Sequence, residues 1–126
     1  MMRVVFKREL IEGLLEYAKE AHPNEILVLL RGRKKGTEII IESVVIPPFF
    51  IGGEEFASFN PYLLPADMSI VGSVHSHPSG IKRPSTQDLL HGFGPIIVIL
   101  GYPYRDPIAD VAVFDREGNI IPFRLF

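Results

Sequence analysis

The sequence contains no cysteine among its 126 residues. This absence excludes disulfide bridges, a thiolate nucleophile and every zinc site that depends on sulfur ligands. A chain without cysteine also suits a reducing compartment, where disulfides do not persist. We therefore expect a cytoplasmic protein.

The sequence also lacks long apolar runs and a surplus of basic residues. Its longest apolar stretches are ILVLL (26–30) and IIVIL (96–100), far shorter than the about 20 residues that cross a bilayer. No apolar stretch follows the basic residues at the start, so we expect no signal peptide. The net charge is −2, whereas nucleic-acid binding requires a concentrated basic face. We expect neither a membrane nor a nucleic acid as partner.

What the sequence does contain is a globular balance of 47% hydrophobic and 22% charged residues. At this length we expect one domain, residues 1–126, with a core of its own. Apolar residues spaced by three and four predict a long helix over 8–22, ended by Pro23. Segments that are almost entirely apolar, such as 25–32, predict buried strands. The strands are expected at 3–6, 25–32, 37–47, 69–77, 95–102, 110–115 and 120–126, and a second, short helix at 85–93.

The order of these elements predicts an α/β fold with a mixed sheet. Turn residues at 31–36 and 116–119 indicate hairpins, which require antiparallel pairs and argue against a doubly wound parallel sheet. Residues 47–68 are rich in proline and glycine, so we expect an irregular segment with a short strand near 56–59. We find no repeat, linker or low-complexity segment.

The stretch GSVHSHPSG (72–80) places two histidines at the end of a predicted strand. Residues two apart in a strand face the same side, so His75 and His77 present both imidazoles to one face while Ser76 points away. Two neutral imidazoles in this arrangement suit zinc. A third protein ligand and an open position would make such a zinc site catalytic. The alternative is that both histidines are ordinary polar residues where a strand meets a loop.

Asp88 is the natural third ligand, because the loop 78–84 can return the first turn of the next helix to the strand end. The same residue has a structural interpretation. Ser85 and Asp88 have the spacing of a capping box, in which each side chain binds a backbone N–H of the other residue. In that case the carboxylate only stabilises the helix start.

The stretch HSHPSGIKRPSTQD (75–88) resembles the signature of the JAMM (MPN+) metalloprotease family. It has the family's His-Ser-His, then seven residues, a serine, two residues and an aspartate. The segment HPNEILVLLRG (22–32) is similar to the family's glutamate-bearing strand, although Val28 stands where a glycine is often found. The resemblance implies a cytidine-deaminase-like α/β sandwich, a curved mixed sheet flanked by a long N-terminal helix and a short helix after the zinc-binding strand.

The resemblance also implies a role for each matching residue. His75, His77 and Asp88 would bind a zinc ion (Zn²⁺). Glu25 would be the general acid–base that moves the proton from water to the leaving amine. Ser85 would donate to the oxyanion of the tetrahedral intermediate. The residues alone show only that a water-activating carboxylate is needed, and they do not select Glu25 among the other glutamates.

By this resemblance the protein is expected to be a zinc metallo-isopeptidase. It would cleave after the C-terminal Gly-Gly of ubiquitin-like modifiers or sulfur-carrier proteins and of their lysine conjugates, as a monomer or homodimer. The alternatives are a non-catalytic scaffold of the same fold, a peptidase that trims one residue from a sulfur-carrier protein, and a DNA-processing relative. A nucleobase deaminase is disfavoured, because its zinc site uses a Cys-x-x-Cys pair.

Three further features each allow more than one interpretation. The apolar stretch at 47–52 is a candidate gate, a dimer surface or part of the core. Lys82 and Arg83 lie in the loop beside the histidines, where they either meet a substrate carbonyl or carboxylate or are simply solvated. His91, three residues after Asp88, is either a partner of the site or an exposed helix residue.

Overall fold

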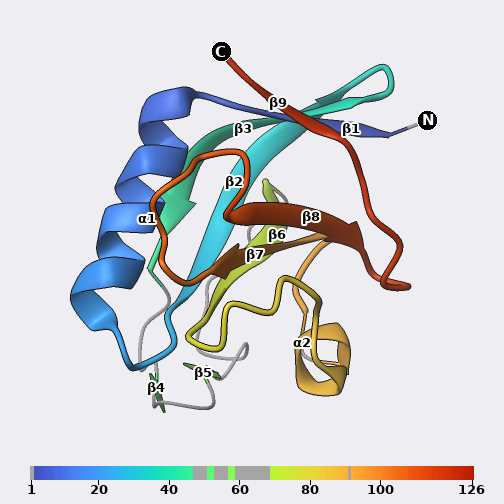
Figure 1. The fold of residues 1–126 in the computed structure, drawn as a ribbon. Helices are drawn as coiled ribbons and strands as arrows, with labels where there is room; N and C mark the ends of the chain where they lie inside the picture. The colour runs from blue at the N-terminus through green and yellow to red at the C-terminus, as the bar shows by residue number, and fades with distance from the viewer. Residues whose placement is uncertain (1, 47–50, 53–56, 59–68, 91) are drawn as a thin grey trace.

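Seven strands form one curved, mixed β-sheet with a helix on each face (Figure 1). The computed structural model describes residues 2–46, 51–52, 57–58, 69–90 and 92–126. A separate two-stranded sheet completes the described elements. In chain order these are β1 Arg3–Phe6, α1 Arg8–Ala21, β2 Leu27–Lys35, β3 Glu38–Val45, β4 Ile51–Gly52, β5 Ala57–Ser58, β6 Ile70–His77, α2 Thr86–Leu90, β7 Ile96–Gly101, β8 Val111–Asp115 and β9 Phe123–Leu125.

The strand order across the large sheet is β8-β7-β6-β2-β3-β1-β9. β6 and β7 are parallel, as are β1 with β3 and β1 with β9, and the other neighbours are antiparallel. Parallel neighbours require a crossover between them, and the crossover from β6 to β7 contains α2. The end of β6, where the two histidines lie, is thus followed at once by the loop and helix that return over the sheet.

The long helix α1 covers one face of the sheet through a stripe of apolar residues. Ile11, Leu14, Leu15 and Ala18 are buried, which follows the three-to-four spacing that the sequence predicts. They belong to the larger core cluster, together with inward-facing residues of β2, β6 and β7 such as Val74. The helix ends at Ala21, one residue earlier than expected and two before Pro23.

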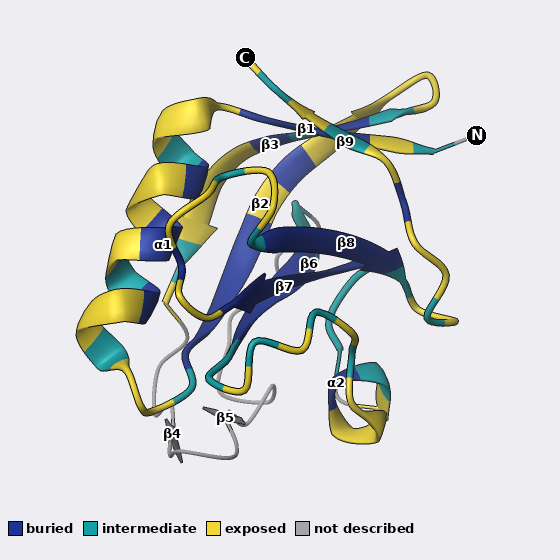
Figure 2. Ribbon diagram, in the orientation of Figure 1, coloured by how far each residue is buried: buried dark blue, intermediate teal, exposed yellow. Residues whose placement is uncertain are grey.

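The short helix α2 covers the opposite face. Leu89 packs against a second cluster formed by Ile97, Ile99, Ala112 and Phe114. Figure 2 shows β7 buried along its length and β8 buried except at its last residue. Arg116 holds the end of α2 in place, because its guanidinium donates to the carbonyl oxygen of Leu89 at 3.4 Å and to that of Gly94 at 3.2 Å. A helix of five residues could not persist without such contacts.

The β2–β3 hairpin is longer than the sequence indicates. β2 continues through its basic residues to Lys35, which pairs with Glu38, so the expected turn over 31–36 is wrong. β3 is also paired with β1 over Glu38–Ile40, so this end of the hairpin belongs to the sheet, and exposed charged side chains do not end it. The chain reverses at Gly36, whose φ of 62° lies in the left-handed region that glycine tolerates.

The closing strand lies elsewhere than expected. The sequence predicts a strand over 120–126 that returns beside β8, but only an isolated bridge joins Phe114 to Ile120. Pro122 has no N–H and cannot continue such a ladder. The chain instead crosses to the far edge of the sheet, where β9 runs parallel to β1. The aromatic rings of Phe6 and Phe123 meet there edge to face at 6.0 Å.

The segment between β3 and β6 is described only at β4 and β5, which pair antiparallel through Ile51–Ser58 and Gly52–Ala57. A short strand near 56–59 is thus confirmed at Ala57–Ser58. Residues 47–50 of the apolar stretch, and His91, lie outside the described residues. In the part of the chain that the structure covers, neither helix is long and apolar enough to span a membrane.

Candidate metal centre

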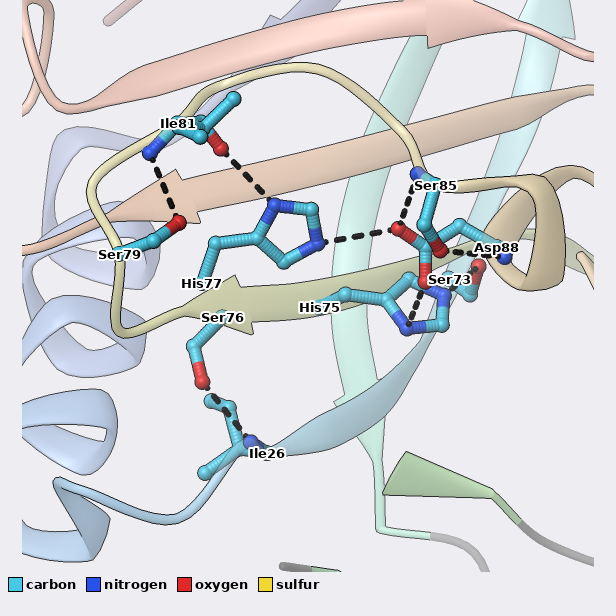
Figure 3. Close-up of polar contacts among 9 residues, drawn as sticks. All are labelled: Ile26, Ser73, His75, Ser76, His77, Ser79, Ile81, Ser85 and Asp88. Atoms are coloured by element: carbon cyan, nitrogen blue, oxygen red, sulfur yellow. Dashed lines mark hydrogen bonds and ion pairs between the residues drawn. The ribbon is translucent and has the colours of Figure 1, made fainter. Parts of the chain in front are cut away.

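The two histidines of β6 face the same side of the sheet, as their spacing predicts. Both point toward α2, whereas Ser76 between them points to the face that α1 covers (Figure 3). His75 is 3% exposed, and His77 is only partly buried because β6 ends there. The site therefore has one deep histidine and one at its opening.

Asp88 reaches both histidines from the first turn of α2. Its Oδ1 lies 3.3 Å from Nδ1 of His75, and its Oδ2 lies 3.0 Å from Nε2 of His77. The carboxylate is itself buried, with 7% of the residue exposed. The structure thus brings His75, His77 and Asp88 together, although ten residues separate Asp88 from His77 in the sequence.

The capping box is present as well. Asp88 Oδ2 accepts the backbone N–H of Ser85 at 2.8 Å, and Ser85 Oγ accepts that of Asp88 at 3.1 Å. The two interpretations of Asp88 are therefore compatible, because the carboxylate has two oxygens. Oδ2 serves the helix start and His77, while Oδ1 faces His75.

Burial and the contacts with the Asp88 carboxylate determine the protonation states of His75, His77 and Asp88. Burial lowers the pKa of His75 to about 4, and the nearby Asp88 charge opposes the shift only in part. Burial also lowers the pKa of His77, but hydrogen bonds with Asp88 and with the Ile81 carbonyl outweigh it, and the pKa is raised overall. The pKa of Asp88 falls to about 2, because its hydrogen bond with His77 and the other polar contacts outweigh burial. At neutral pH His75 is a neutral imidazole and Asp88 a carboxylate.

His75 keeps one ring nitrogen available. Its Nε2 is hydrogen-bonded with Ser73 Oγ at 3.1 Å, but its buried Nδ1 has no hydrogen-bond partner. This nitrogen and Asp88 Oδ1 face each other at 3.3 Å. In the tautomer with the proton on Nε2, the Nδ1 lone pair and the carboxylate oxygen are two acceptors that face each other, and such a pair suits a metal ion.

The distance between His75 and Asp88 agrees with this interpretation. Neighbouring donors of a tetrahedral site with bonds of about 2.0–2.1 Å lie about 3.3 Å apart, which is the His75–Asp88 separation. In the described part of the chain, no group of three such side chains is arranged so that it could hold an ion. His77 and Asp88 are instead in hydrogen-bond contact at 3.0 Å.

Glu25 lies just before β2, across from His77. β2 and β6 are antiparallel, and their pairing continues past the strand end, where Ser76 N donates to Ile26 O at 3.3 Å. Extending this register by one residue places Glu25 opposite His77. Its charge is among the causes that raise the pKa of His77. The sequence pattern alone did not indicate this juxtaposition.

Sequence reasoning missed the groups that orient the histidines. Ser73 binds Nε2 of His75, while Nδ1 of His77 is 2.8 Å from the Ile81 carbonyl oxygen, to which it donates. Ser79 Oγ in turn accepts the Ile81 N–H at 3.2 Å. Ser73 could have been found from strand alternation, because it lies two residues before His75. The Ile81 carbonyl depends on the loop conformation, which no local pattern specifies.

Comparison with known proteins identifies the family. A family described as prokaryotic homologues of the JAB domain matches residues 7–113, a range that includes all five candidate residues. The chain belongs to this prokaryotic JAB family. A Haloferax volcanii protein named a probable metalloprotease is 35% identical over 133 aligned positions, which cover 94% of this chain and 81% of that protein.

This JAB-family chain is also similar to solved structures over its whole length. A JAB1/MPN domain protein from Archaeoglobus fulgidus is 28% identical with a TM-score of 0.67, covering 100% of this chain and 97% of that one. A protein described as JAMM, a metalloprotease-like zinc site in the proteasome and signalosome, is 30% identical with a TM-score of 0.69 over 100% and 98% of the two chains. A Desulfitobacterium hafniense protein, 23% identical with a TM-score of 0.72 over 98% and 92%, supports the fold alone. The predicted JAB/MPN fold is confirmed.

Proposed function

We propose that this JAB-family protein is a zinc-dependent metallopeptidase that cleaves after the C-terminal Gly-Gly of ubiquitin-like proteins. The observation that carries the proposal is the buried Nδ1 of His75, which faces Asp88 Oδ1 at 3.3 Å without a hydrogen-bond partner. His75, His77 and Asp88 would hold the ion. Two imidazoles and one carboxylate are three protein ligands, the number typical of catalytic zinc sites. When bound, zinc supplies a Lewis acid and a water of lowered pKa.

The chain's own residues would move the protons and stabilise the negative charge. Glu25 lies opposite His77 in the extended register and would accept the proton of the attacking water, then deliver it to the leaving amine. Ser85 is exposed at the start of α2, and its Oγ already accepts the Asp88 N–H. Its hydroxyl proton therefore remains available to donate to the oxygen that becomes negative as the carbonyl is attacked.

The substrate class rests on the JAMM resemblance and on the metalloprotease-like relatives. A Gly-Gly tail has no side chains. It can therefore lie extended along the protein backbone and enter the site at its open side, beside His77. The main sheet has its edges at β8 and β9, away from β6. The β4–β5 pair, drawn at the end of the molecule where β6 ends, is the better candidate for binding an extended tail as an added strand (Figure 1). The partners would be small ubiquitin-like modifiers and their lysine conjugates.

Cleavage of fusion proteins tests this function. Candidate ubiquitin-like proteins fused through Gly-Gly to a reporter are incubated with the purified protein, with and without a chelator. We expect cleavage that stops on chelation and returns when zinc is added, and a large loss when the tail is changed to Ala-Ala. Cleavage that survives chelation would contradict zinc dependence. Equal cleavage of both tails would contradict the substrate class.

Lys82 favours a second candidate, a peptidase that trims one residue from a sulfur-carrier protein. Gly101 pairs with His77 across β6 and β7, and a Cβ at Gly101 would lie 2.7 Å from Lys82 Cγ. The lysine stem thus lies over Gly101, on the face of the sheet that carries the histidines. Among the described residues no carboxylate pairs with its ammonium group. A free C-terminal carboxylate one residue beyond the scissile bond would supply that partner.

The two candidates predict different effects of Lys82→Gln. If a free carboxylate is bound, the variant should raise KM by about five- to tenfold for a substrate with one residue after Gly-Gly, since an ion pair near the surface contributes about 1 kcal/mol. It should leave cleavage of a long fusion within about twofold. Arg83→Gln in the same loop is the matched control. An equal effect on both substrates would remove the argument for trimming.

Ser73 should tune metal affinity. Removing a group that orients a metal-binding histidine typically lowers the affinity for the metal by about 10- to 100-fold. Ser73 is such a group, because its Oγ is hydrogen-bonded with Nε2 of His75. We therefore expect Ser73→Ala to lower zinc affinity by that factor in competition with a chromophoric chelator. Ser43→Ala, which removes an exposed hydroxyl of β3, should change it little. Unchanged affinity in Ser73→Ala would mean that the serine does not orient the ring.

A further inference from the structure

Ser76 makes a contact that a regular β-sheet does not contain. Its N–H donates to the Ile26 carbonyl oxygen at 3.3 Å, as in an antiparallel ladder. In a regular pair the two residues exchange both backbone bonds, so the Ile26 N–H would bind the Ser76 carbonyl. It binds Ser76 Oγ instead, at 2.8 Å (Figure 3). A side chain has replaced the backbone at this one position.

The replacement occurs just before the first residue of β2. β2 begins at Leu27, so the ladder ends between Leu27 and Ile26. The hydroxyl thus links β6 to the residue that precedes β2, one position from Glu25. It fixes the backbone of Ile26 with respect to β6, and Glu25 is attached to that backbone.

The burial of Ser76 indicates that this contact is specific. The residue is 0% exposed and lies on the α1 face of β6, where Val74 belongs to the larger apolar core. A hydroxyl in such surroundings is unfavourable unless it is hydrogen-bonded. An apolar residue would satisfy the packing but would leave the buried Ile26 N–H without its acceptor.

We propose that Ser76 is a positioning residue that sets Glu25 relative to the two histidines. This inference rests on the proposed function, in which Glu25 moves the proton. The two serines of β6 then act on different sides of the sheet, because Ser73 orients His75 on the α2 face and Ser76 holds the Glu25 segment on the α1 face. Loss of Ser76 should reduce proton transfer without releasing the metal.

The test compares Ser76→Ala with Val74→Ala, a neighbouring change on the same face of the same strand. For Ser76→Ala we expect kcat to fall by about 10- to 100-fold, the loss typical of a catalytic group displaced by about 1 Å, with zinc content and KM unchanged. The backbone amide of Ile26 should exchange with deuterium faster. Val74→Ala should lower the melting temperature yet keep kcat within about twofold. Ser76→Thr, which retains the hydroxyl, should restore most of kcat.

The outcomes separate this inference from the proposed function. If Ile26 exchange is unchanged in Ser76→Ala, or if zinc content falls in step with activity, the positioning role is wrong. If the wild-type protein cleaves no fusion, the proposed function fails, and the exchange of Ile26 still decides whether Ser76 holds this segment. Should Ser76→Ala not fold, Ser76→Cys carries the same test, because it keeps the volume and offers only a weak acceptor.

Discussion

Glu25→Gln should abolish most turnover while the protein remains folded and metal-loaded. Glutamine keeps the size and hydrogen-bonding capacity of the side chain but cannot accept a proton. Removing a general acid–base typically costs about 10²- to 10⁴-fold, and we expect kcat on a Gly-Gly fusion to fall within that range. The measurement is single-substrate kinetics together with elemental analysis of the same sample.

A matched control is Glu20→Gln, which changes an exposed glutamate of α1 five residues earlier. It should leave kcat unchanged. If Glu25→Gln retains wild-type turnover, another group moves the proton. If the variant loses zinc in proportion to activity, Glu25 acts on the metal and the assigned role is wrong.

His77→Ala should remove the metal itself. The imidazole contributes one of three protein ligands, and Asp88 loses the hydrogen bond that is its leading stabilising contact. Two remaining ligands fall below the three that catalytic zinc sites keep. We expect zinc content to drop from about one per chain to near zero after dialysis, and cleavage to disappear with it.

His22→Ala is the control for a general effect of losing a histidine. His22 caps α1 and stacks on Tyr102 with ring centroids 4.5 Å apart, and its loss should leave metal content unchanged. Thermal unfolding of both variants separates metal loss from loss of structure. One zinc per chain in folded His77→Ala would show that the ion is held by other groups.

The sequence predicted those parts of the site that depend on local periodicity. The two-residue alternation of a strand was sufficient to place His75 and His77 on one face. The capping-box spacing was sufficient to place the Asp88 carboxylate at the helix start. Apolar periodicity likewise located α1 and the buried strands to within a few residues.

Long-range pairing explains what the sequence did not predict. The position of Glu25 depends on the register between β2 and β6, which are separated by the whole hairpin and the segment after it. Only the family resemblance selected this glutamate. The parallel pairing of β9 with β1 joins the two ends of the chain. Pro122 argues against a continued ladder beside β8, but nothing in residues 120–126 selects β1 as the partner. The contact of Ser76 with Ile26 also depends on the β2–β6 register.

The most direct test is anomalous diffraction at the zinc absorption edge from crystals of the protein grown with zinc. We predict one strong peak among the His75 and His77 rings and the Asp88 carboxylate, at about 2.0–2.2 Å from the coordinating atoms. Zinc bound only at other residues, with these three side chains still in contact with one another, would contradict the proposed metal centre.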